Sequence, residues 1–148
     1  MNKNLSEKVA IEAGRIMLRR IDELLTENVN FAFETTLATK TYKNTILRAK
    51  AAGYTVTLLF FWLQTISLAK ERVKKRVTEG GHNIDETVIE RRYLNGIINL
   101  FDIYLPIADE VLIFDNLEGK HELIAKKIND LGLSILNEPK FNYMVDNH

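Results

Sequence analysis

The sequence of 148 residues lacks cysteine, has only two prolines, and carries no excess charge of either sign. Without cysteine the chain forms no disulfide, no thiolate zinc site and no cysteine nucleophile, a composition that fits a reducing compartment. The 20 basic residues balance 20 acidic ones. A general nucleic-acid binder needs a basic excess, so this balance predicts no nucleic-acid partner.

Long hydrophobic runs are also missing. The first eight residues lack the apolar region of a signal peptide. The most apolar stretch, residues 56–63, is shorter than the roughly 20 residues that span a bilayer. A hydrophobic share of 46% and a charged share of 27% are ordinary for a globular protein. We therefore expect a soluble, cytoplasmic protein without a membrane partner, built as one domain over 1–148 with a tail at 117–148.

Helical and strand-like segments alternate along the chain. Helical spacing and capping residues predict helices over 6–25, 42–52, 68–77 and 85–104, with caps at Ser6, Ser67 and Asp85 and a C-terminal glycine at Gly53. Alternating or continuous β-branched and aromatic residues predict strands at 29–34, 54–63 and 110–116. Because segment 54–63 is almost wholly apolar, we expect that strand to be buried on both faces.

The C-terminal tail has two interpretations. Residues 122–128 form either a helix or a strand that pairs with 133–136 across a turn of Asn, Asp and Gly, and we favour the hairpin. Pro139 then opens a short helix over 141–144. Together the segments predict an α/β fold: a mostly parallel sheet, flanked by helices on both faces, with a C-terminal β-hairpin.

Polar residues follow two of the predicted strands, at the sheet edge where α/β proteins bind ligands. Glu34, Thr35 and Thr36 end the first strand, and Glu34 there is either a substrate-binding group or a solvated strand end. Asp115 and Asn116 end the third strand and are interpreted as a polar turn.

A basic segment lies between the second and third strands. Arg72 and Arg76 are four residues apart and share a helix face, and Arg91 with Arg92 follows a Gly-Gly hinge. Guanidinium groups bind phosphate oxygens bidentately, although a charge run in isolation favours a solvated helix face. His82, beside the hinge, is a further phosphate-facing candidate, whereas the scattered histidines predict no metal site.

Two common catalytic signatures are absent from the sequence. No Gly-x-Ser-x-Gly elbow occurs. No Gly-x-x-x-x-Gly-Lys-Ser/Thr phosphate-binding loop occurs either, and the only Gly-Lys pair has Phe114 where the first glycine belongs.

Several short motifs, in this order and spacing, resemble the zeta-toxin-like P-loop kinases of bacteria, over about residues 11–116. They are Phe31-Ala32-Phe33-Glu34-Thr35-Thr36-Leu37, Arg48-Ala49-Lys50-Ala51-Ala52-Gly53-Tyr54, Glu71-Arg72-Val73, Arg76-Val77, Gly80-Gly81-His82-Asn83-Ile84, Arg91-Arg92-Tyr93 and Asn99-Leu100-Phe101.

The resemblance implies roles for these residues. Glu34 with Thr35 and Thr36 looks like the substrate-side motif, Arg72 and Arg76 like phosphate-facing arginines, and Arg91 or Arg92 like the lid arginine. The family's ATP and Mg²⁺ are implied as cofactors, and a small molecule such as a nucleotide sugar as substrate.

The family's first strand, Walker A loop and general base would precede Met1. The resemblance therefore implies a P-loop-kinase-like fold lacking the N-terminal strand and P-loop, and a chain that is inactive alone. An antitoxin, a separate P-loop-containing segment or a second copy of the chain are the partners expected. The alternatives are a non-catalytic interaction module, and an enzyme that uses Glu34 and the arginines without a nucleotide.

Overall fold

A computed structural model describes residues 3–81, 83–117 and 120–147. The chain separates into two compact units, Met1–Glu34 and Thr35–His148. None of the helices in these described segments combines the length and the apolarity needed to cross a membrane.

The first unit contains one long helix and an irregular segment. Helix α1 spans Lys3–Glu27, so Ser6 lies inside the helix and the predicted cap is wrong. Asn28, with φ 55°, ends α1 in the left-handed conformation typical of a helix C-terminus. The predicted strand at 29–34 is also wrong, because this segment has no hydrogen-bonded neighbour in the described sheet. Local alternation alone does not make a strand, which exists only by pairing.

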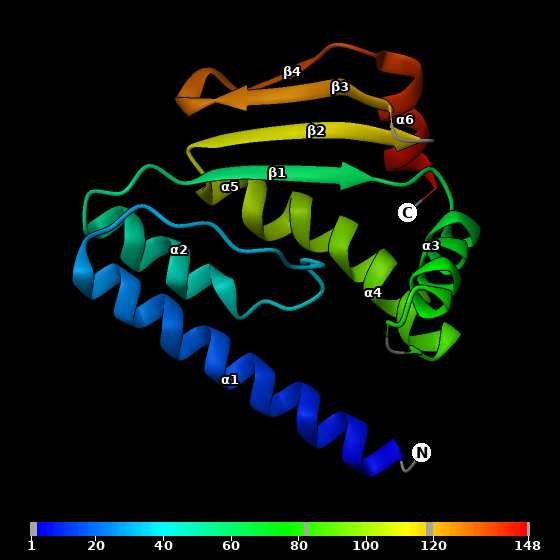
Figure 1. The fold of residues 1–148 in the computed structure, drawn as a ribbon. Coiled ribbons are helices and arrows are strands. Elements are labelled where there is room, and N and C mark those ends of the chain that lie inside the picture. The colour runs from blue at the N-terminus through cyan, green and yellow to red at the C-terminus, as the bar shows by residue number, and fades with distance from the viewer. Residues whose placement is uncertain (1–2, 82, 118–119, 148) are drawn as a thin grey trace. The chain divides into compact units, whose positions relative to one another are not determined.

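The second unit contains the sheet and the remaining helices (Figure 1). In chain order the elements are α2 (Tyr42–Ala51), β1 (Thr57–Trp62), α3 (Ile66–Thr78), α4 (Glu86–Asn99), a π-helical turn η1 (Leu100–Tyr104), α5 (Leu105–Ile107), β2 (Glu110–Leu117), β3 (Lys120–Ile128), a 3₁₀ turn η2 (Asn129–Leu131), β4 (Leu133–Ile135) and α6 (Glu138–Asp146).

The strands lie in the order β1-β2-β3-β4. Only β1 and β2 are parallel, with Trp62 beside Asp115, whereas β2–β3 and β3–β4 are antiparallel. The α/β class and the C-terminal hairpin are therefore confirmed, and the mostly parallel sheet is corrected to a mostly antiparallel one. The hairpin adds two antiparallel strands on one side, while the described chain supplies only one parallel neighbour, β1, on the other.

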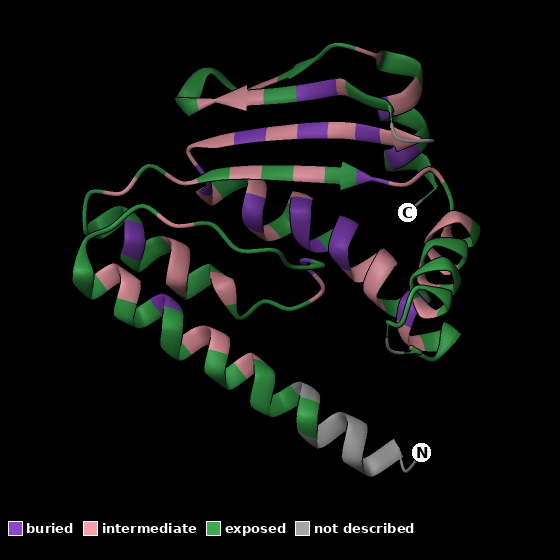
Figure 2. Cartoon of the chain, in the orientation of Figure 1, coloured by how far each residue is buried: buried purple, intermediate pink, exposed green. Residues whose placement is uncertain are grey.

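The core lies on one face of the sheet. Alternate residues of β2 point inward, where Val111 and Ile113 meet Leu100 and Tyr104 (Figure 2). β1 is not buried on both faces as predicted, because Leu59 and Phe61 expose 51% and 46% of their surface. For unit 2, helices therefore do not cover both faces of β1. A continuous run of apolar residues therefore does not by itself show that helices cover both faces of a strand.

Capping residues set most helix ends. Asp85 caps α4 by accepting from the Thr87 N–H, and Gly53 follows α2 with φ 89°, both as predicted. α3 begins after Thr65, whose hydroxyl accepts from Leu68 N–H, and not after Ser67. Thr65 has the extended backbone that a cap requires.

Candidate functional site

The loop of residues 35–39, which carries two predicted site residues, packs tightly on α4. A Cβ placed on Gly96 would lie 2.6 Å from the carbonyl oxygen of Thr36, so only glycine permits this approach. The Thr35 hydroxyl accepts from the Leu37 N–H at 3.1 Å, and Leu37 is buried with φ 57°. This contact and these turns fix the path of the loop, and they leave the side chains of Thr35 and Thr36 exposed.

Two buried side chains hold the same loop from below. The Asn99 amide donates to the Leu37 carbonyl at 2.9 Å, and the Tyr104 hydroxyl donates to the Thr39 carbonyl at 2.5 Å. Burial raises the pKa of Tyr104 above its ordinary value, so its hydroxyl keeps the proton that it donates to still higher pH than an exposed tyrosine does. These two bonds fasten loop 35–39 at two points.

The π-helical turn η1 brings the two donors to one side. Residues five apart in an α-helix point about 140° apart, given 3.6 residues per turn. Here the Leu105 N–H donates to the Leu100 carbonyl, the i→i+5 bond of a π turn, which places residues five apart on a common side. Asn99 and Tyr104 are five apart, and η1 therefore lets both face the loop.

Glu34 is exposed and is the last residue of the first unit, whereas Thr35 begins the second. Its predicted role in substrate binding stays a prediction. It does not end a strand as expected, because residues 29–34 are irregular.

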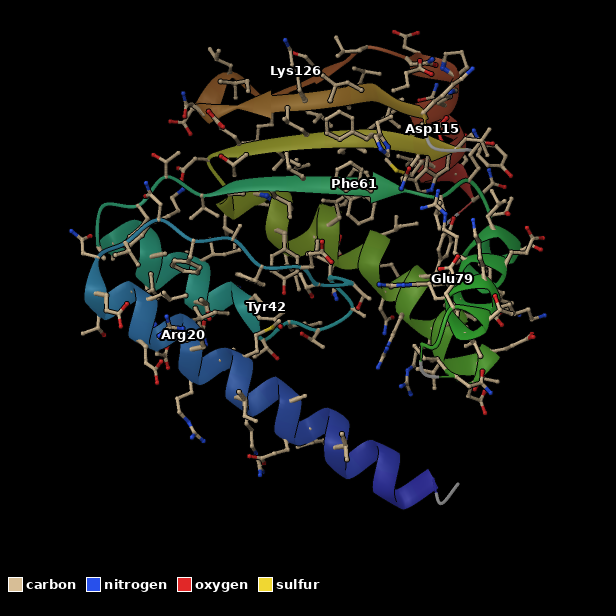
Figure 3. The ribbon with its side chains drawn as sticks, viewed as in Figure 1. Arg20, Tyr42, Phe61, Glu79, Asp115 and Lys126 are labelled. Atoms are coloured by element: carbon tan, nitrogen blue, oxygen red, sulfur yellow. The ribbon has the colours of Figure 1, made fainter. Side chains whose placement is uncertain are left out.

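Arg72 lies where the parallel pair of strands ends. β1 ends at Trp62, whereas β2 continues to Leu117, so the Asn116 carbonyl extends beyond its neighbour strand. The guanidinium of Arg72 reaches from α3 and donates to that carbonyl at 2.6 Å. Because a guanidinium has five N–H donors, four remain for another acceptor. The structure thus places a cation at the carboxyl end of the parallel pair. Figure 3 labels Asp115, the last residue of β2 that pairs with β1.

The other predicted arginines lie on the surfaces of α3 and α4. Arg76 and Arg91 are exposed and Arg92 is half-buried. Ion pairs between lysines of α3 and glutamates of α4 connect the two helices: Lys70 pairs with Glu86 and Glu90, and Lys74 pairs with Glu86. His82 lies outside the described residues.

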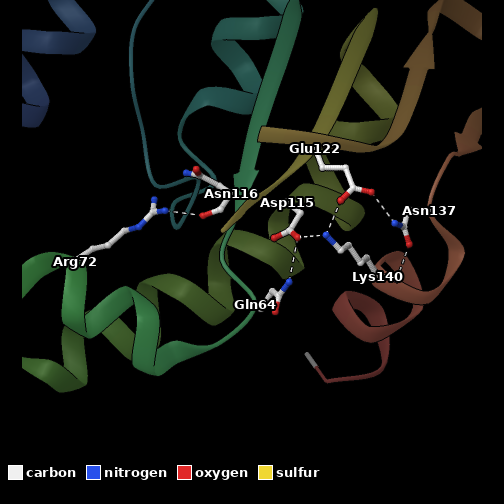
Figure 4. Close-up of polar contacts among 7 residues, drawn as sticks. All are labelled: Gln64, Arg72, Asp115, Asn116, Glu122, Asn137 and Lys140. Carbon is white, nitrogen blue, oxygen red and sulfur yellow. Dashed lines mark hydrogen bonds and ion pairs between the residues drawn. The ribbon is translucent and has the colours of Figure 1, made fainter. Parts of the chain in front are cut away.

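A buried carboxylate, Asp115, anchors a polar network next to Arg72 (Figure 4). Asp115 is 2% exposed, and its Oδ2 accepts from the Gln64 amide at 3.0 Å and from Lys140 Nζ at 2.5 Å. Lys140 also bonds Glu122 at 2.6 Å, and Asn137 donates to Glu122 at 2.7 Å. We call these five residues the strand-end network. It connects the ends of β1 and β2, the start of β3 and α6.

Charge pairing shifts the pKa values within the strand-end network. The hydrogen bonds of Lys140 to Asp115 and Glu122 raise the pKa of the lysine. Those from Lys140 and Asn137 lower the pKa of Glu122. The second oxygen of Asp115, Oδ1, is buried without a hydrogen-bond partner. Lys140 is therefore the main countercharge that this buried carboxylate has.

Sequence reasoning missed the role of Asp115. The interpretation of Asp115 and Asn116 as a polar turn is wrong, because both belong to β2. The signal was the alternation of β2, in which Val111, Ile113 and then Asp115 occupy inward positions. Lys140, Asn99 and Tyr104 carried no such signal, since their partners are distant in sequence.

The residues present fit part of the implied cofactor. Exposed guanidinium groups suit the phosphate oxygens of ATP. Within the described segments, however, no three acidic or histidine residues come close enough together to hold a metal ion. Mg²⁺ in kinase sites keeps several waters and is held by one or two carboxylates together with substrate phosphates.

Comparison with known proteins gives the family. The model described as zeta toxin matches residues 1–128. The chain belongs to the zeta toxin family. At this coarse level the zeta toxin chain is related to kinase-like P-loop proteins.

One relative of this zeta toxin family member is an uncharacterized protein from Haemophilus influenzae, 29% identical over 83 residues. The aligned region covers 56% of this chain and 59% of the relative, so the chain spans about three fifths of that protein's length. No solved structure matches the chain.

Proposed function

We propose that this chain supplies the substrate-side and lid-side parts of an ATP-dependent small-molecule kinase of the zeta toxin type. A nucleotide sugar is the substrate class that this family points to. The chain transfers no phosphate alone, because its 148 residues contain no Gly-x-x-x-x-Gly-Lys-Ser/Thr motif. A segment bearing that motif would complete the enzyme, by pairing with the open edge of β1.

The position of Arg72 supports this proposal most. Its guanidinium stands at the carboxyl end of a parallel strand pair, the edge at which α/β proteins bind ligands. Lys70 and Lys74 of α3 form ion pairs with Glu86 and Glu90 of α4. These carboxylates therefore do not neutralise the arginines. This pairing favours the phosphate-facing role of the arginines over a merely solvated helix face.

The other candidate residues divide in the same way between the substrate-side and lid-side parts. Arg76, Arg91 and Arg92 with Arg72 offset charge on the transferring phosphoryl group and on ATP. Thr35 and Thr36, on the fixed loop 35–39, and the neighbouring Glu34 accept or donate hydrogen bonds to the substrate. Mg²⁺ arrives with the nucleotide and depends on ligands from the completing segment.

A turnover assay tests the proposal. The purified chain with Mg-ATP and a panel of nucleotide sugars should give no phosphotransfer, and addition of a Walker A segment from a zeta toxin relative should restore it. Robust turnover by the chain alone that disappears in Glu34→Ala would contradict the proposal. Failure of the added segment to restore any turnover would contradict it as well.

Self-association is the second candidate function. Leu59 and Phe61 of the edge strand β1 are about half exposed, and Phe61 stacks on Phe114 at 5.2 Å between ring centroids and meets His121 edge-on. β1 contains no charge and no proline, the features that normally block an exposed edge. A second copy presents the same uncharged edge, so two β1 strands could pair to continue the sheet.

Light scattering separates the two functions. Self-association predicts a dimer whose dissociation constant rises in Phe61→Lys, whereas a monomer at high concentration contradicts it. The kinase function also allows an antitoxin protein as partner, as the zeta toxin context suggests.

A further inference from the structure

Arg72 depends on one particular backbone carbonyl for its orientation. Asn116 lies one residue beyond the last pairing of β1 with β2, so its carbonyl has lost the neighbour strand that would otherwise share it. Arg72 fills that gap at 2.6 Å. The direction of the guanidinium is therefore set by the direction of the Asn116–Leu117 peptide group, to which this carbonyl belongs.

The end of β2 that carries this peptide group is held in turn by the side chain of Asp115, the residue before Asn116. Asp115 is 2% exposed and is bonded to Gln64 from the segment after β1 and to Lys140 from α6. A buried carboxylate without a countercharge is costly, and the structure relieves the cost by moving or by taking up a proton. Removal of Lys140 would therefore disturb the end of β2, where Arg72 is attached.

Lys140 itself is unsuited to bind a phosphate. Its ammonium lies 2.5 Å from Asp115 and 2.6 Å from Glu122, and both bonds raise its pKa. Two carboxylates thus compete with any incoming anion for this cation. Lys140 acts on an anion only through other residues.

We propose that Lys140 and Asp115 are positioning residues for Arg72, acting through the end of β2 that carries the Asn116 carbonyl. The proposal rests on the phosphate-facing role of Arg72. The basic side chains of two different helices meet consecutive residues of one strand: Lys140 holds Asp115 on the inner side, and Arg72 takes the carbonyl of Asn116.

Titration of pyrophosphate into the full chain by calorimetry tests the proposal. Lys140→Met should weaken pyrophosphate binding about tenfold, the scale of one lost charge-assisted hydrogen bond. Lys140→Arg should stay near wild type, because a guanidinium still bridges both carboxylates. Lys127→Met is the matched control: it removes the same charge from a lysine that bonds the carbonyls of Leu105 and Ala108, and it should change affinity less than about twofold.

A double-mutant cycle separates positioning from direct binding. In an Arg72→Ala background, Lys140→Met should have no further effect on affinity. A further loss there would mean that Lys140 contacts the anion itself and would overturn the proposal. If Lys140→Met does not fold, Asp115→Asn/Lys140→Met removes the buried charge together with its countercharge and serves in the same cycle.

A readout without any ligand keeps the two proposals distinct. The side-chain Nη–H resonances of Arg72, whose Nη2 donates to the Asn116 carbonyl, are assigned by their loss in Arg72→Ala. They should move to the free-arginine position in Lys140→Met but not in Lys127→Met. An unchanged resonance overturns the positioning role. A wild-type chain that does not bind pyrophosphate but shows the shift contradicts the phosphate-facing role alone.

Discussion

Gly96 and Thr36 are in direct backbone contact, since the carbonyl of Thr36 occupies the space that a side chain on Gly96 would need. The separation from an ideal Cβ would be 2.6 Å, and the obstructing atom is backbone. Loop 35–39 can therefore pack this closely on α4 only because residue 96 has no Cβ atom.

Gly96→Ala should therefore destabilise the chain by about 1–3 kcal/mol, the cost of forcing an extra group into a packed contact. Urea denaturation measures this change. Gly14→Ala is the control, because a Cβ there meets nothing within 4 Å inside α1 and should stabilise the chain by up to about 1 kcal/mol. Equal effects of the two substitutions would contradict the close seating of loop 35–39.

Asn99 and Tyr104 should also contribute to the order of loop 35–39. Asn99→Ala leaves the Leu37 carbonyl without its donor and should cost about 1–3 kcal/mol, and Tyr104→Phe somewhat less. Amide hydrogen exchange at Leu37 should accelerate in both variants. Asn147→Ala, at the exposed end of α6, should leave exchange at Leu37 unchanged.

Local patterns predicted much of the fold. The sequence was enough to place two helix ends and the hairpin, because the residues that determine them contact only near neighbours in the chain. These residues are Asp85, Gly53 and the turn Asn129–Gly132. Contacts between residues far apart in the sequence could not be predicted in the same way. Residues 29–34 look like a strand but are irregular in the structure, and Phe61 looks buried but exposes 46% of its surface.

The candidate site was predicted less completely. Arg72 was expected to face phosphate, yet its partner, the Asn116 carbonyl, is 44 residues away. The Asp115–Lys140 pair spans 25 residues, and only the inward alternation of β2 hinted at a buried carboxylate. The π turn had no sequence signature at all, because one extra residue per turn is decided by packing.

The stability of the chain should depend on Asp109 at acidic pH. The hydrogen bond from Lys50, at 2.9 Å, and that from the Val56 N–H, at 2.8 Å, lower the pKa of Asp109 below its ordinary value of 3.8. Its contribution is thus fully present above the unfolded-state pKa and is lost as pH falls through the lower folded-state pKa.

Urea denaturation at a series of pH values checks this dependence. The wild type should be more stable than Asp109→Asn at neutral pH, and the difference should shrink as pH falls through the folded-state pKa. Asp130→Asn, which removes an exposed carboxylate of turn η2, is the matched control and should change stability at neutral pH by less than about 0.5 kcal/mol. A constant gap between wild type and Asp109→Asn at all pH values would contradict the assignment.

The most direct test of the account is the affinity of the chain for pyrophosphate, compared between two α3 variants at one low salt concentration. Arg72→Ala/Arg76→Ala should weaken binding by at least about tenfold, because the proposed function has both guanidinium groups face the anion. Lys75→Ala, which removes an exposed charge from the same helix, should weaken it less than about twofold. Equal losses, or an unchanged affinity in the arginine variant, would contradict a phosphate-facing α3.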